Sequence, residues 1–570
     1  MHNILKFFLR LSPAVYAVAI LLAALMLTFL QGTLSLQNDD FQIFFMLCGG
    51  GTEPAPFALY TNVCLGSTIS GLSSVFPCVN WYLCFLFLLA VASCTSLNFT
   101  ICHRMAQVPA AARFAACLLL LYADYACLTS MQYTHVAVSA ACAGALLVSE
   151  VLSGRFSGWR IAACAGLIFG AFCLRTSSIL PAIFLLAGIM VAQFGDLFSA
   201  KRWKHTAVAL GIPASLCGIA FVVNSVTYSQ HPEWNDALHF LQARVQIVDS
   251  KDNSGLDKDA DLETAGISPA AFQRFKQFIY EPEMDSLPNV EKALQIHKEG
   301  RKGVLGSTDA ANVGLLKFDF SSIKPKGTIL QFITPYVPLL AAIVLVFFVP
   351  ERRRIRSAVL FLVPVLCYLL ILAFLGRMVG RVLNPVLYAA GVYIASMQAA
   401  PRIHAAKWQA GSAILTSLLA CAFCFRHYSL GALFKKGEGD SPLAYCKQHP
   451  DTLFLTCCQQ GCGLFPTGFT GYTYDYLQKT NIFPIADGWM FYTPAYKSAM
   501  QRRGIANPYV TLLDGHTCVV VYKPWDPPAT LNAVSTQVKH HTGQEISFRK
   551  VHECGVFEFW EPELCATGCP

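Results

Sequence analysis

Charged side chains are scarce in this chain. Only 13% of its 570 residues are Asp, Glu, Lys or Arg, whereas 55% are hydrophobic and the mean hydropathy is +0.47. A soluble globular protein carries roughly 25% charged residues. The composition therefore excludes an ordinary soluble protein and predicts an α-helical polytopic membrane protein.

An internal repeat of fixed period is also missing. Its absence argues against a solenoid and weakens the case for a transporter built from inverted repeats. Acidic residues are rare inside the apolar runs, where Asp124 and Glu150 are the examples. We expect Asp124 to pair with an Arg of the bundle, because a lone charge in lipid is costly.

Long apolar runs fill most of the first 425 residues. A transmembrane helix needs roughly 20 apolar residues, and about eleven runs qualify. They centre on 12–34, 79–102, 111–130, 133–150, 161–178, 179–195, 206–224, 333–350, 357–375, 384–400 and 409–425. Only Arg175–Ser178 and Pro181 separate the fifth run from the sixth, so one long bent segment is the competing interpretation.

Lys and Arg in the short connections predict the orientation. When the spans are threaded alternately, almost every short basic loop falls on one side, which the positive-inside rule makes cytoplasmic. The N-terminus is then cytoplasmic and the C-terminus lies outside. The run 12–34 is too long for a signal-peptide core, so we interpret it as a retained first span. The net charge of +8 reflects this loop bias and predicts no nucleic-acid partner.

Three pieces lie outside the membrane in this threading. They are the loop 35–78, the segment 225–330 and the tail 426–570, the first two within a transmembrane domain 1–425. The tail reads as a small α/β domain. Its predicted elements are helices at Pro494–Arg502 and Ala529–Thr542, a hairpin of Tyr509–Leu513 and Thr517–Tyr522, and strands at Glu545–Val551 and Gly555–Trp560.

The tail holds part of the cysteine content. Of the 23 cysteines in the chain, those in the tail are Cys446, Cys457, Cys458, Cys462, Cys518, Cys554, Cys565 and Cys569. An even number in an outward-facing domain predicts disulfides. A zinc site and free thiols are the alternatives, although no quartet with convincing zinc spacing is visible.

Two adjacent carboxylates, Asp39 and Asp40, follow the first span. Charges beside lipid are expensive and usually have a task. A carboxylate at a low-dielectric boundary has a raised pKa, which suits a general base, and Asp40 is also a candidate ligand of Mg²⁺ or Mn²⁺. The alternative is a cap for a surface helix at Phe41–Leu47. Glu53 is a weaker third acid.

Arginines predict a phosphate site on the same outer side. Arg377 and Arg381 occupy a short outer turn, where the positive-inside rule disfavours them, and Arg175 falls at another outer end. Guanidinium groups bind phosphate in bidentate fashion, so a lipid-linked phosphate is the expected partner. The alternatives are contact with lipid headgroups for the pair and an ion pair within the membrane for Arg175.

Two further side chains are weak candidates for substrate contact. His135 lies in the very short outer turn Gln132–His135, but a lone His is more often structural. Arg244 lies in the outer segment 225–330, where a salt bridge to Asp249 is the alternative.

The order of these features resembles the GT-C superfamily of polyprenyl-phosphate-dependent membrane glycosyltransferases. In bacterial members of that type the first loop carries Asn-Asp-Asp, a Gly-rich turn, Asn-x-x-Leu-Gly and a closing Pro with Trp-Tyr. The matching residues here are Asn38–Asp40, Gly49–Gly51, Asn62–Gly66 and Pro77–Tyr82, and the turn 376–385 is also similar. The chain departs at Ala55, where an Asp is expected.

The resemblance implies an inverting sugar transfer at the outer face of a bacterial inner membrane. The donor would be a polyprenyl-phosphate sugar, and the acceptor a glycan, lipid or protein. Asp39 or Asp40 would deprotonate the acceptor, the three arginines would neutralise the leaving phosphate, and Asn62 would contact substrate weakly. The alternatives are a lipid-linked glycan flippase or transporter, and a non-catalytic membrane protein whose outer domain binds a partner.

Overall fold

A computed structural model describes most of the chain. The described residues are 12–30, 39–49, 54–105, 110–193, 202–248, 259–276, 279–281, 283–306, 352–374, 379–397, 442–457, 480–485, 490–523 and 526–565, with a few positions in 336–343 and 411–419. The predicted spans 333–350 and 409–425 lie largely outside them. Glu53, Asp249, Arg377, Cys458, Cys462 and Cys569 also lie outside the described residues.

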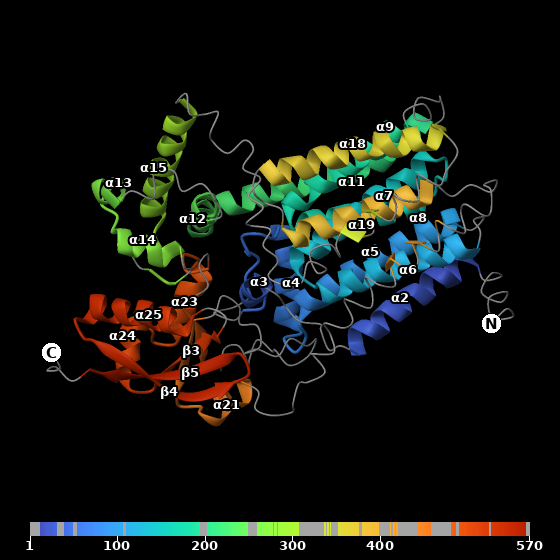
Figure 1. Ribbon diagram of the computed structural model, residues 1–570. Coiled ribbons are helices and arrows are strands. Elements are labelled where there is room, and N and C mark those ends of the chain that lie inside the picture. Colours follow the sequence, from blue (N-terminus) through green and yellow to red (C-terminus); the bar gives the residue numbers. More distant parts are fainter. Residues whose placement is uncertain are drawn as a thin grey trace.

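The other predicted spans form a bundle of long, roughly parallel helices (Figure 1). Five described helices are long and apolar enough to cross a membrane, which supports an integral membrane protein. The bundle contains α2 (Pro13–Leu30), α5 (Trp81–Arg104), α6 (Ala110–Thr129), α7 (Tyr133–Leu152), α8 (Gly158–Leu174), α9 (Ile179–Ala192), α11 (Arg202–Ser229), α18 (Arg352–Phe374) and α19 (Gly380–Met397). Helices suit these apolar runs because they satisfy their own backbone hydrogen bonds in lipid.

The fifth and sixth predicted spans are separate helices. The backbone of Arg175 is extended, with φ −155° and ψ 110°, and this ends α8. A short 3-10 turn, η2 (Thr176–Ser178), then leads into α9. The competing interpretation of one long bent segment is therefore wrong, and Arg175 lies at the corner between two helices.

One end of the bundle is basic. Arg104, at the end of α5, forms an ion pair with Glu150 near the end of α7, and Arg155 pairs with the same carboxylate at 2.9 Å. The ring of Phe156 stacks on His205 near the start of α11, at 4.0 Å between centroids. Connections that the threading placed on one side therefore meet at one end of the bundle.

Asp124 has a different partner from the predicted one. Its Oδ2 accepts a hydrogen bond of 2.5 Å from the Asn98 side chain, and both residues are fully buried. Among the described residues, Asp124 forms no ion pair with an Arg. A neutral amide thus binds one oxygen of the buried carboxyl group where a charged Arg was expected.

Two short helices lie at the end of the bundle opposite the basic end. They are α3 (Asp40–Leu47) and α4 (Val63–Val75). Every residue of α3 is buried within the protein, and its predicted position along the membrane surface stays a prediction. A Cβ atom at Gly66 of α4 would lie 1.9 Å from the carbonyl oxygen of Pro56. Glycine is therefore required there to bring α4 against the loop that follows α3.

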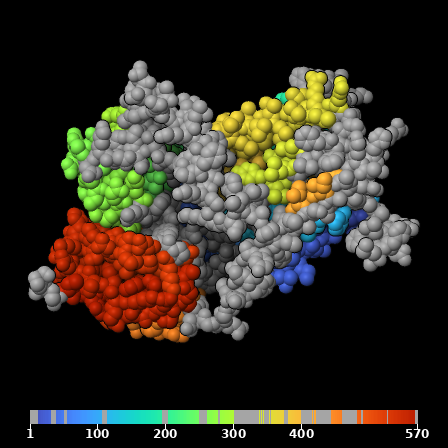
Figure 2. Space-filling model, viewed as in Figure 1, coloured from blue at the N-terminus to red at the C-terminus, as the bar shows by residue number. Residues whose placement is uncertain are grey.

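A second body lies beyond this end (Figures 1 and 2). Its helical part contains α12 (Pro232–Val248), α13 (Asp259–Thr264), α14 (Pro269–Lys276) and α15 (Leu287–Gly306). Its C-terminal part contains α21 (Pro442–Gln448), β1 (Leu453–Cys457), β2 (Ile482–Pro484), α23 (Pro494–Arg502), α24 (Pro508–Thr511), η6 (Leu512–Asp514), β3 (Thr517–Tyr522), α25 (Pro527–Thr542), β4 (Ile546–Cys554) and β5 (Phe557–Leu564).

The C-terminal strands form one mixed sheet in the order β2-β1-β3-β5-β4. β1 is parallel to β2 and β3, whereas β5 is antiparallel to β3 and β4. The predicted hairpin before β3 is wrong, because Tyr509–Leu513 belongs to α24 and η6. Pro508 opens α24, and the Asn507 side chain caps it by accepting the Tyr509 N–H at 2.9 Å.

Buried polar groups join the two parts of this body. Arg274 of α14 pairs with Glu281 at 2.6 Å, and Gln537 of α25 donates a hydrogen bond to the same carboxylate. The N–H of Tyr280 donates to the carbonyl of Ile485 at 3.1 Å. Segments far apart in the sequence are thus fixed against each other.

The described tail cysteines form no disulfides with one another. Cys446, Cys457, Cys518 and Cys565 are free thiols. Burial raises the pKa of Cys446 and of Cys457 to about 12, so both stay protonated at neutral pH. The prediction of disulfides is not supported by these four residues. Cys446, Cys457 and Cys518 are buried and fill the core as small apolar groups, whereas Cys565 is exposed.

Candidate active site

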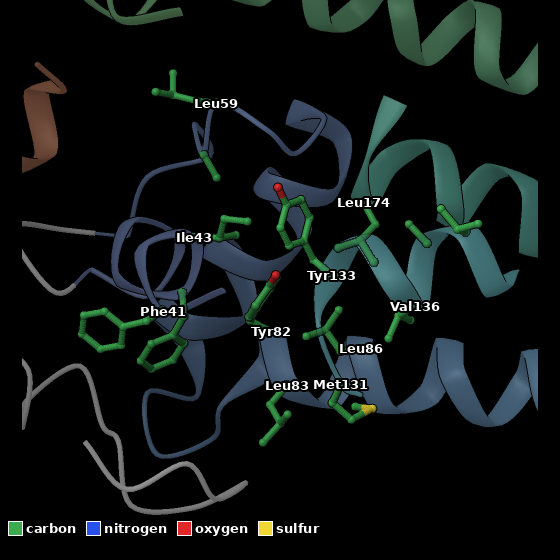
Figure 3. Packing of buried hydrophobic residues seen from close by; sticks show 14 of the residues in the cluster. Phe41, Ile43, Leu59, Tyr82, Leu83, Leu86, Met131, Tyr133, Val136 and Leu174 are labelled. Carbon is green, nitrogen blue, oxygen red and sulfur yellow. The ribbon is translucent and has the colours of Figure 1, made fainter. Parts of the chain in front are cut away.

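Asp40 is a buried anchor between three helices. It lies in the first turn of α3 and has an exposure of 0%. The Tyr82 hydroxyl at the start of α5 donates to its Oδ1 at 2.6 Å. The Tyr133 N–H at the start of α7 donates to both carboxylate oxygens, at 3.0 and 3.3 Å. Hydrogen bonds to a carboxylate are strong, so Asp40 fixes α3 against α5 and α7. Tyr82 and Tyr133 belong to the same buried cluster as Phe41 of α3 (Figure 3).

Asp39 is the open member of the pair. Its side chain is 26% exposed, and its Oδ2 lies 4.0 Å from Nη1 of Arg381 in the first turn of α19. The Tyr133 hydroxyl is 3.4 Å from the same oxygen. The Asp39 side chain makes no capping bond to α3, so the alternative role as a helix cap does not describe it.

Arg175 reaches the same place from the corner between α8 and α9. Its guanidinium donates to the Tyr133 hydroxyl at 2.7 Å, to the Thr134 hydroxyl, and to Ser177 Oγ at 3.0 Å. It also lies over the rings of Tyr60 and Tyr133, at 5.9 and 5.1 Å from their centroids. Hydroxyls and aromatic faces hold the cation, and no carboxylate of the described residues pairs with it.

The structure therefore brings four of the predicted site residues together, one pair by direct contact and the others through Tyr133. Arg381 lies beside Asp39, and one hydroxyl connects Asp39 to Arg175. Asp40 is attached through the backbone of Tyr133. Residues that are up to 342 positions apart thus meet at the end of the bundle opposite its basic end.

The weaker candidates make contacts of another kind. Asn62 caps α4, accepting the Cys64 N–H at 2.9 Å, and its amide donates to the Ala220 carbonyl at 3.1 Å. His135 is 2% exposed in the first turn of α7. The Arg244 guanidinium donates to the Phe275 carbonyl at 3.4 Å and covers that ring. These contacts tie helices together, and substrate binding by the three residues stays a prediction.

Sequence reasoning missed the hydroxyl groups of the site. Tyr133 and Thr134 stand in the outer turn in which the sequence singles out only His135, and Tyr82 enters the sequence analysis only as the end of the motif Pro77–Tyr82. The signal that could have found them is the predicted topology. The threading places the start of the second span, with Tyr82, and the turn Gln132–His135 on the same side as Asp39 and Asp40. Ser, Thr and Tyr hydroxyls at the outer ends of predicted spans are therefore candidate site residues on the same footing as charged side chains.

The described residues do not make a metal site by themselves. They contain no group of three His, Cys, Asp or Glu side chains placed to hold an ion. Both oxygens of Asp40, the predicted ligand, accept protein hydrogen bonds. A divalent ion stays a prediction that these residues do not support.

Comparison with known proteins gives one distant likeness. No family model matches the sequence, and no curated protein matches it. ArnT from Cupriavidus metallidurans in the apo state is 13% identical over 96% of this chain and 97% of that chain, with a TM-score of 0.37. The same protein bound to undecaprenyl phosphate is 14% identical over 97% and 99%, with a TM-score of 0.38. At this distance the likeness assigns no residue role and no reaction to this chain.

Proposed function

We propose that the chain transfers a sugar from a polyprenyl-phosphate donor to an acceptor hydroxyl at the outer face of the membrane. One observation carries the proposal. A partly exposed carboxylate, Asp39, lies 4.0 Å from Arg381 and one hydroxyl away from Arg175. Transfer from a lipid phosphate needs a base for the attacking hydroxyl and cations for the departing phosphate, and this site supplies both.

Asp39 is the base in this proposal. The acceptor hydroxyl gives its proton to the Asp39 carboxylate while its oxygen forms a bond to the anomeric carbon. The bond from that carbon to the phosphate oxygen breaks, and its electron pair leaves with the polyprenyl phosphate. Attack from the face opposite the phosphate inverts the anomeric centre. Asp40 positions α3, because its oxygens are engaged by Tyr82 and Tyr133.

Arg175 and Arg381 are the described phosphate-binding groups. Negative charge grows on the phosphate as the glycosidic bond breaks, and guanidinium donors stabilise it most at that stage. Arg377 is proposed as a third cation from the same turn as Arg381. A donor lipid would reach these groups from the bilayer, since they stand at the ends of membrane helices.

The test is a transfer assay with purified protein in lipid nanodiscs. Radiolabelled polyprenyl-phosphate hexoses and pentoses are supplied with membrane glycolipid and glycan acceptors, and label in product and in released sugar is counted. We expect wild type to turn over at least one donor and Asp39→Asn to lose about 100-fold or more in kcat, the usual scale of general-base catalysis. Equal rates for the two proteins would remove Asp39 from the mechanism.

The same preparation separates the transferase from a flippase. A lipid-linked glycan flippase would move the labelled donor between leaflets of a vesicle without releasing or transferring sugar. Movement without transfer by wild type would replace this proposal. The described residues favour the transferase, because the acid and the arginines meet at a bundle end and the one deep acid, Asp124, is engaged by Asn98.

A further inference from the structure

One phenol oxygen stands between the cation and the anion of the site. The Tyr133 hydroxyl accepts a hydrogen bond from Arg175 Nη1 at 2.7 Å and lies 3.4 Å from Asp39 Oδ2, to which it donates. The backbone N–H of the same residue holds Asp40. Tyr133 is therefore the residue through which both carboxylates and Arg175 are connected.

The surroundings of Arg175 also keep it from a carboxylate. Besides Tyr133, the hydroxyls of Thr134 and Ser177 accept its hydrogen bonds. The ring of Tyr60 lies against the guanidinium and 5.9 Å from the Tyr133 ring. Within the part of the chain that the structure describes, Arg175 has no ion pair, although Asp39 is only one hydroxyl away.

A direct contact between these two groups would disable both. Arg and a carboxylate form strong bidentate pairs when nothing separates them, and the pairing occupies two donors and both carboxylate oxygens. The guanidinium would then offer fewer donors to a phosphate. The carboxylate, which already lies 4.0 Å from Arg381, would become a weaker base still, because a second nearby cation favours its charged form further.

We propose that Tyr133 is a positioning residue whose hydroxyl holds Arg175 and Asp39 apart, so that each stays available to its own substrate group. The inference rests on the proposed function and deepens it, since it explains how Tyr133 keeps the Arg175 guanidinium available to bind the donor phosphate. In this arrangement Arg175 donates to neutral hydroxyls that a phosphate oxygen can replace.

Substitution with Phe isolates the hydroxyl. Tyr133→Phe keeps the backbone N–H that binds Asp40 and keeps the ring against Tyr60. Without the hydroxyl, Arg175 can close on Asp39. The inference then predicts an unusual rescue, in which removing the charge of Asp39 frees Arg175 again.

The experiment measures binding of undecaprenyl phosphate to the full-length protein in nanodiscs. We expect Tyr133→Phe to bind about tenfold more weakly than wild type, and Tyr133→Phe with Asp39→Asn to return to within about threefold of Asp39→Asn alone. Tyr393→Phe is the matched control. Its phenol is also buried and accepts a 3.0 Å hydrogen bond, from Gln193, but it lies near Arg104 at the basic end.

A second pair of variants covers the case in which Tyr133→Phe does not fold. In an Arg175→Gln background Asp39 has only Arg381 beside it, as in wild type, so adding Asp39→Asn should change undecaprenyl-phosphate binding no more than the same substitution does in wild type. Thr134→Val removes another hydroxyl from Arg175 but leaves the Tyr133 hydroxyl between Arg175 and Asp39, so Asp39→Asn should not rescue it.

Three outcomes overturn the inference. Tyr133→Phe could bind as wild type does, the double variant could stay as weak as Tyr133→Phe, or Asp39→Asn could improve binding more in the Arg175→Gln background than in wild type. A wild type that turns over donors but shows one of these results refutes only the role of Tyr133. A wild type that neither binds undecaprenyl phosphate nor turns over donors refutes the proposed function, and this inference with it.

Discussion

Asp39 and Asp40 are adjacent in sequence and opposite in surroundings. One is partly exposed beside Arg381, whereas the other is fully buried and accepts hydrogen bonds from two helices. The difference follows from α3, because its first turn points Asp40 into the bundle and leaves Asp39 just outside the helix. Sequence alone could place the pair at the outer end of the first span but could not divide the two roles.

This division predicts different defects in the two Asn variants. In wild type both carboxylate oxygens of Asp40 accept hydrogen bonds, from Tyr82 and Tyr133. Asp40→Asn replaces one of these acceptor oxygens with an NH2 group, which can only donate. A mispaired buried polar group costs about 1–3 kcal/mol, so we expect a lower unfolding temperature. Asp39→Asn should unfold within about one degree of wild type. Thermal unfolding followed by intrinsic fluorescence in detergent measures both, and a destabilised Asp39→Asn beside an unaffected Asp40→Asn would reverse the assignment.

Arg381 allows a charge test at the same scale. Arg381→Gln removes one of two described cations near Asp39, and we expect undecaprenyl phosphate to bind about tenfold more weakly. High salt should weaken undecaprenyl-phosphate binding by wild type more than binding by the variant, because the Arg381 side chain is partly exposed and salt screens its charge. Arg549→Gln is the matched control, since its ion pairs with Glu561 and Glu563 lie on the exposed β4–β5 hairpin. Equal loss in both variants would indicate a nonspecific effect of charge.

The same residues show where sequence reasoning ended. Charged residues next to predicted membrane spans can be recognised from the sequence alone, so Asp39, Arg175 and Arg381 could all be chosen as candidate site residues. The hydroxyls that organise them are ordinary residues at helix starts, and only the packing of α3, α5 and α7 gives Tyr82 and Tyr133 their partners.

At the scale of elements, α4 depends on one close approach. A Cβ at Gly66 would lie 1.9 Å from the Pro56 carbonyl oxygen, whereas a Cβ at Gly71 of the same helix would meet nothing within 4 Å. We therefore expect Gly66→Ala to displace α4, lower the unfolding temperature and reduce donor binding. Gly71→Ala should be neutral or stabilising by roughly 0.5–1 kcal/mol, because Ala favours a helix interior. Comparable behaviour of the two variants would contradict this packing.

The tail elements show what local patterns can and cannot decide. Pro494–Arg502 and Ala529–Thr542 were predicted as helices and are α23 and most of α25, and both predicted strands after them are β4 and β5. The hairpin before β3 failed because Tyr509–Leu513 has apolar, strand-favouring residues while Asn507 and Pro508 form a helix start. A capping signal outweighed strand propensity.

The tail cysteines give an element-scale prediction of their own. Cys446, Cys457 and Cys518 are buried free thiols. Alkylation of the native protein should therefore spare them, and alkylation after unfolding without reductant should label all three. Mass spectrometry of the peptides reads this directly. If labelling of these residues needs a reducing agent, they are disulfide-bonded and this description of the tail is wrong.

At the scale of the molecule, the ends of the bundle are chemically different. One end holds Arg104, Arg155 and Glu150 in an ion network, and the other holds the candidate site beside α3 and α4. Threading of the apolar runs could predict this separation because short connections force neighbouring helices to alternate. It could not predict how the helical segment α12–α15 joins the C-terminal sheet, since that junction pairs residues such as Glu281 and Gln537 across 256 positions.

The account as a whole rests on a phosphate binding between the arginines and Asp39. The measurement that tests it most directly is an experimental structure of the protein with undecaprenyl phosphate in nanodiscs. The account predicts phosphate density within hydrogen-bonding distance of Arg175 or Arg381, on the open side of Asp39, with Asp40 still bound by Tyr82 and Tyr133. A phosphate bound at the basic end near Arg104, or one with no contact to either arginine, would contradict it.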